Sequence, residues 1–157
     1  MVEGPPYSRL DSTRRSKMPM IDVTSAAGTF ADKPALTKAL AEAMMRWEKV
    51  PPIDFFSANT AAFVHELPPD SLSNARGDAN YIRVEILTPV GILDREKKLG
   101  VVKEMTEIVA GAAGDPTVAD RTWVLISEAP DGGWGINGHA YLNSEIADSA
   151  RKILAGG

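Results

Sequence analysis

Apolar positions along most of the chain follow two spacings, one typical of strands and one typical of helices. Short apolar or alternating runs predict strands over 20–24, 61–67, 81–87 and 123–128. Between the first two strands and between the last two, apolar residues recur at helical spacing. The predicted helical stripes are Leu36, Leu40, Ala43, Met44 and Trp47, then Leu99, Val102, Met105 and Val109. The chain therefore reads as β-α-β written twice.

Residues at the expected helix ends support this reading. Asp32 and Asp94 stand where each helix begins, and an aspartate there caps free backbone N–H groups. The first helix must stop before Pro51, since a proline cannot continue it. Gly114 is expected to end the second helix.

The two halves also match in detail. Gly28 and Gly91 follow the first strand of each half, and Leu36 and Leu99 occupy equivalent helical places. A crossover helix makes the two strands of each half parallel, with a right-handed connection. We expect α+β architecture: a four-stranded mixed sheet with two helices on one face. The other, uncovered face predicts an oligomer.

Composition shifts divide the chain. Residues 1–17 are rich in arginine and proline and poor in aliphatic residues, so we expect a disordered extension or a misassigned start. The tandem domain should run over 18–142, with units 18–69 and 81–142. Within it, 139–142 is a candidate closing strand. Residues 143–157 read as a short helical or frayed tail.

Charge and residue counts narrow the function. A net charge of -4 argues against nucleic acid or an anionic membrane as the main partner. The chain has no cysteine, which fits the cytoplasm, and only two distant histidines, so neither a metal nor another cofactor is expected. No apolar run approaches the roughly 20 residues that cross a bilayer.

The dipeptide Met18-Pro19 has a chemical consequence. If translation began at Met18, removal of that methionine would give Pro19 a free secondary amine. An ordinary terminal amine has a pKa near ~8, and a dry site lowers the pKa toward neutrality, where the amine acts as a base. The alternative is that Pro19 only begins a strand.

The opening residues 18–23, the repeat, and the closing stretches 124–130 and 133–138 resemble the tautomerase superfamily, in particular a fused form of 4-oxalocrotonate tautomerase. The resemblance covers 18–142. It implies a tautomerase/MIF-like homotrimer that converts a small keto or enol compound, with Pro19 as general base and Trp134 as the aromatic wall of the pocket. Trp134 as a loop anchor is the alternative role.

The chain departs from the family at the substrate-binding arginines. Thr29 and Ile92 stand where the family usually has an arginine, and Ile82 replaces the proline of the second unit. Arg121, placed on the same strand face as Trp123, and Arg83 are the candidates for holding a carboxylate. Other readings stay open: a proline-based hydratase or dehalogenase, a non-catalytic oligomeric binding module of this fold, or an unrelated sensor.

Overall fold

The computed structural model describes residues 18–156 of the chain. The expected extension over 1–17 lies outside the described residues. One four-stranded sheet organises the fold, with strand order β2-β1-β3-β4. Its strands are β1 (Met20–Ala26), β2 (Ala61–Leu67), β3 (Ile82–Pro89) and β4 (Thr122–Ala129).

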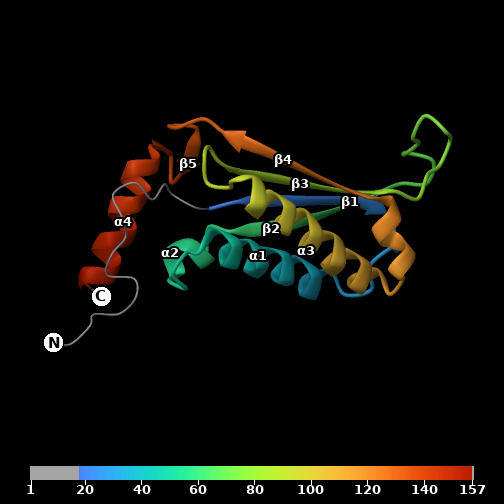
Figure 1. Ribbon diagram of the computed structural model, residues 1–157, viewed down its shortest axis with the longest axis horizontal. Coiled ribbons are helices and arrows are strands. Elements are labelled where there is room, and N and C mark those ends of the chain that lie inside the picture. The colour runs from blue at the N-terminus through green and yellow to red at the C-terminus, as the bar shows by residue number, and fades with distance from the viewer. Residues whose placement is uncertain (1–17, 157) are drawn as a thin grey trace.

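The pairing confirms the tandem arrangement. Strands β1 and β2 are parallel, as are β3 and β4, and the two units join through antiparallel β1 and β3. Helices α1 (Lys33–Glu48) and α3 (Arg95–Ala113) lie side by side on one face of the sheet, as Figure 1 shows. The expected α+β fold is therefore correct.

The predicted helix caps form. The side chain of Asp32 accepts a 3.0 Å hydrogen bond from the backbone N–H of Ala35, and Asp94 accepts one of 2.8 Å from Lys97. Gly114 ends α3 with φ of 66°, a left-handed conformation that glycine adopts without strain.

The apolar stripe predicted for the second helix, α3, was wrong at two of its four residues and correct at Met105 and Val109. Leu99 and Val102 are 54% and 37% exposed, whereas the buried face of α3 is formed by Val101, Met105 and Val109. Both sets repeat at helical spacing, so spacing alone did not choose between them. The buried set packs with α1 and the inward side chains of the sheet, such as Val23 and Val84, in the main core.

The rest of the described chain adds smaller elements. Trp134–Ile136 (β5) and His139–Tyr141 (β6) form a separate two-stranded hairpin, so the predicted closing strand pairs outside the main sheet. The chain ends in α4 (Asn143–Gly156), and α2 (Asp54–Ser57) and η1 (Pro116–Arg121) complete the fold.

The sheet face opposite the helices stays open in the single chain. Large apolar side chains on β2, β3 and β4 are exposed there: Phe63, Leu87, Trp123 and Leu125 are 49%, 39%, 39% and 52% exposed. Among the described residues, no helix combines the length and apolar character that a membrane span needs.

Candidate active site

The beginning of β1 lies at the end of the sheet that α2, β5 and α4 cover. Met18 is fully buried, Pro19 is buried, and Met20 is half-buried. Figure 1 shows this end of β1 beside β5 and α4. Pro19, an internal amide in this chain, is therefore shielded from solvent.

Trp134 lies at this same end. Its side chain is 7% exposed and belongs to the apolar cluster that also contains Met18. It lines a cavity of about 270 Å³ together with Met20, Asn59, Leu87, Gly133, Gly135 and Ile136. Met18 and Met20 both belong to the apolar surroundings of Trp134, and Pro19 lies between these two methionines in the chain.

The turn before Trp134 is tight. Gly132 has φ of 84°, and the N–H of Gly133 donates a 2.9 Å hydrogen bond to the carbonyl of Pro130. A side chain at Gly133 would begin 2.9 Å from that carbonyl oxygen, so only glycine fits. After β5, Asn137 and Gly138 both have positive φ, as a two-residue hairpin turn demands. The two turns fix the direction of the indole.

The loop is also tied to α4. The N–H of Asn143 donates a 2.7 Å hydrogen bond to Asp131, and the N–H of Leu142 donates one of 2.8 Å to Glu145. The Leu142 bond is the largest cause of a lowered pKa of Glu145, and Nε2 of His139, 3.2 Å from the same carboxylate, lowers that pKa further.

A buried polar pair lies close to Pro19. Leu87 is the register partner of Met20, so Thr88 is the next residue of β3 beside Pro19 in the antiparallel pairing. The hydroxyl of Thr88 donates a 2.7 Å hydrogen bond to Glu48, and both residues are fully buried. Sequence patterning missed Glu48, whose only signal was a carboxylate in the last turn of an amphipathic helix.

The two candidate arginines lie elsewhere in the chain. Arg83 pairs with Thr24, about 17 Å along the strand from Pro19 at roughly 3.3 Å per residue. Arg121 ends η1 and is not on β4, which corrects its predicted position on the strand face of Trp123. Its guanidinium donates to the carbonyl of Asn80 at 3.0 Å and lies 3.4 Å from Asp115.

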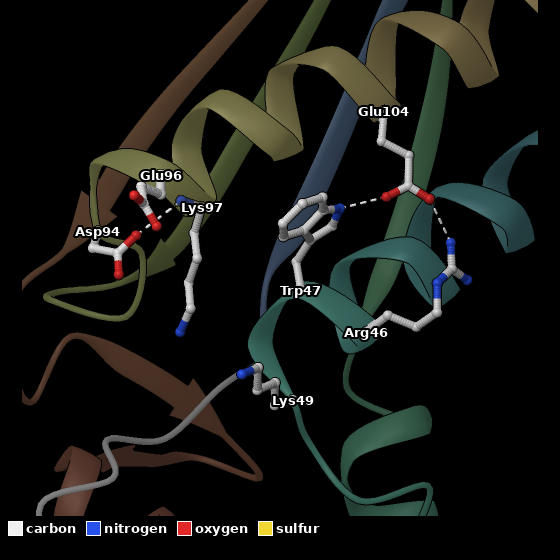
Figure 2. Close-up of a pocket in the computed structure, with 7 residues that line it drawn as sticks. All are labelled: Arg46, Trp47, Lys49, Asp94, Glu96, Lys97 and Glu104. Carbon is white, nitrogen blue, oxygen red and sulfur yellow. Dashed lines mark hydrogen bonds and ion pairs between the residues drawn. The ribbon is translucent and has the colours of Figure 1, made fainter.

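A larger hollow of about 590 Å³ lies on the helix layer, away from the sheet (Figure 2). Its lining is mostly charged, with the indole of Trp47 in its middle. The indole N–H donates a hydrogen bond to the carboxylate of Glu104, and the guanidinium of Arg46 donates a second one of 2.6 Å to the same carboxylate. None of its lining residues belongs to the cluster around Met18. Among residues 18–156, no group of three acidic or histidine side chains is placed to hold a metal ion.

Neither a protein-family model nor a curated protein matches the sequence. Solved structures do match. A fused 4-OT described as a symmetric trimer is 20% identical, with a TM-score of 0.65, and the match covers 82% of this chain and 98% of that one. A member of the cis-3-chloroacrylic acid dehalogenase family is 16% identical, with a TM-score of 0.64 over 88% and 99%.

A macrophage migration inhibitory factor homologue from Prochlorococcus marinus is 20% identical, with a TM-score of 0.62 over 78% of this chain and 98% of that one. These likenesses define the class of the fold. The chain has the α+β fold of these structures, and it resembles the fused 4-OT structures among them.

Proposed function

We propose that this protein is a keto–enol tautomerase in which Pro19, freed at the amino terminus, is the general base. The observation that carries the proposal is the burial of Pro19, whose two chain neighbours, Met18 and Met20, pack in the apolar cluster of Trp134. A dry apolar site penalises the protonated amine, so the pKa of a free Pro19 amine would fall toward neutrality. The amine would take a proton from the enol and return it to carbon.

The proposed assembly is a homotrimer, in keeping with the trimeric fused 4-OT structures and the exposed apolar face of the sheet. In one chain, Arg83 and Arg121 are far from Pro19 along the sheet. We propose that either arginine reaches the pocket of a neighbouring subunit and binds a substrate carboxylate there. The lack of cysteine is in keeping with a cytoplasmic location.

A second function is a non-catalytic binding module of the same fold. The lining of the 270 Å³ cavity favours it, because none of the residues from 18–156 that line it carries a cationic side chain to hold a carboxylate. A proline-based hydratase or dehalogenase is a variant of the first proposal, since the same amine would activate water.

The test compares two forms of the protein. A chain expressed from Met18 is analysed by mass spectrometry for a terminus at Pro19, and is assayed for enol–keto conversion of an aromatic pyruvate. The full chain, in which Pro19 is an amide, is the matched control. Turnover only in the first form, reduced about 10²–10⁴-fold by Pro19→Ala, supports the proposal. Equal turnover in both forms refutes it.

A further inference from the structure

The side chain of Met18 fills a closed apolar chamber. It is fully buried, although it precedes the first strand. The other buried members of its hydrophobic cluster come from distant parts of the sequence: Phe56, Ala129, Trp134, Ile146 and Ala150. A methionine side chain is unbranched and about four heavy atoms long, so the chamber has that size.

The chamber lies within a few bonds of the Pro19 nitrogen, because that nitrogen is bonded to the carbonyl carbon of Met18. Removal of Met18, which a free Pro19 requires, therefore empties a space that begins at the base itself. Apolar cavities of this kind stay dry and take up apolar molecules. A charged group there would lose its hydration without gaining a partner.

Helix α4 forms one wall of the chamber. Ile146 and Ala150 are 0% and 1% exposed, and they are separated by about one helical turn, so both face the cluster. The hydrogen bond from Asn143 to Asp131 ties the start of this helix to the loop before Trp134, and the bond from Leu142 to Glu145 caps the first turn of the helix.

We propose that the chamber occupied by Met18 is a binding subsite for the apolar arm of the substrate, with α4 as the wall that limits its length. The substrate class is a keto or enol compound with an unbranched apolar arm about as long as a methionine side chain. This inference rests on the proposed function, since it assigns the subsite to the same reaction.

The binding test uses the full chain and needs no free amine. Met18→Ala removes a CH₂–S–CH₃ group, and dimethyl sulfide has the same heavy atoms. Dimethyl sulfide should raise the melting temperature of Met18→Ala by several degrees, because a ligand that binds only the folded state stabilises it. It should leave the unsubstituted chain unchanged, since Met18 fills the chamber.

Two matched variants test the location. Met20→Ala loses the same atoms at a half-buried position and should give no shift. Ala150→Phe added to Met18→Ala fills the chamber from α4 and should abolish the shift. If Met18→Ala does not fold alone, recovery of the folded state with dimethyl sulfide is the measurement, and failure to recover overturns the proposal.

The outcomes separate the subsite from the catalytic function. A shift in Met18→Ala that Ala150→Phe removes supports the subsite, even if the chain that begins at Pro19 has no turnover. No shift overturns the subsite, even if that chain is active. For an active chain, Ala150→Phe should lower kcat/KM at least tenfold for a substrate with the long arm and less than twofold for one with a methyl arm. Equal losses overturn the assignment.

Discussion

Thr88 donates a 2.7 Å hydrogen bond to the carboxyl group of Glu48 in the interior of the protein. Both side chains are fully buried, and the bond joins the end of α1 to the end of β3, beside Pro19. A buried carboxyl group that loses a hydrogen-bond donor also loses part of the compensation for its lost hydration. The contact therefore stabilises the end of the sheet where the candidate site lies.

Thr88→Val removes this donor and keeps the shape of the side chain. We expect a loss of about 1–3 kcal/mol in the free energy of unfolding, measured by urea denaturation. Thr106→Val is the control, because that hydroxyl donates only to the carbonyl of Val102 on the surface of α3. Equal losses in both variants would contradict the role given to the buried bond.

Gly100 of α3 leaves room for the indole of Trp47 of α1 where the two long helices meet. A side chain at Gly100 would begin 2.1 Å from the indole, so Gly100→Ala must displace the ring. We expect a loss of about 1–3 kcal/mol in stability, as for other overpacked sites. Gly111→Ala in the same helix meets nothing within 4 Å and should instead gain about 0.5–1 kcal/mol. Thermal unfolding of both variants, which should shift in opposite directions, is the measurement.

The sequence predicted the main sheet and its two helices because local signals and long-range packing agree there. Asp32, Asp94 and Gly114 mark helix ends by backbone chemistry that acts within a few residues. The buried face of α3 was less certain, since Leu99 and Val101 begin equally good helical stripes. Only packing against α1 and the sheet decides between them.

The sequence predicted only part of the candidate site, because spacing along the chain does not show how distant elements pack together. Trp134 was expected near Pro19, and the structure places it beside Met18 and Met20. The wall from α4 was missed, although Ile146 and Ala150 repeat at helical spacing, because the tail was given no docking partner. The proposed contact of Arg83 or Arg121 with the pocket of a neighbouring copy concerns an assembly, and spacing along one chain does not hold that information.

Docking of α4 should depend on pH. Hydrogen bonds from Leu142 and His139 lower the pKa of Glu145 below its ordinary value. A carboxyl group whose pKa is lower in the folded than in the unfolded state stabilises the folded state at pH values above the unfolded-state pKa. This stabilisation is lost as the pH falls through the folded-state pKa. We therefore expect faster opening of the first turn of α4 in acid, measured by hydrogen exchange corrected for the intrinsic rate.

Glu145→Gln should remove most of this acid dependence, since an amide does not titrate in this range. Asp148→Asn is the control in the same helix, because that carboxylate pairs with Arg151 and not with the loop of Trp134. If both variants change the acid dependence equally, the effect belongs to the whole helix and not to Glu145.

The open face of the sheet should be the surface that joins copies of the chain. Leu125 is 52% exposed on this face, on the edge strand β4 and in register with Glu85 of β3. Leu125→Lys places a charge where a neighbouring copy would bury it without a partner, so we expect the proposed trimer to dissociate. Light scattering after gel filtration should then give a mass near that of one 16.8 kDa chain.

Leu99→Lys is the matched control, since Leu99 is 54% exposed on the helix layer and its replacement should leave the oligomer intact. A monomer in the unsubstituted protein, or equal dissociation in both variants, would contradict assembly through the sheet.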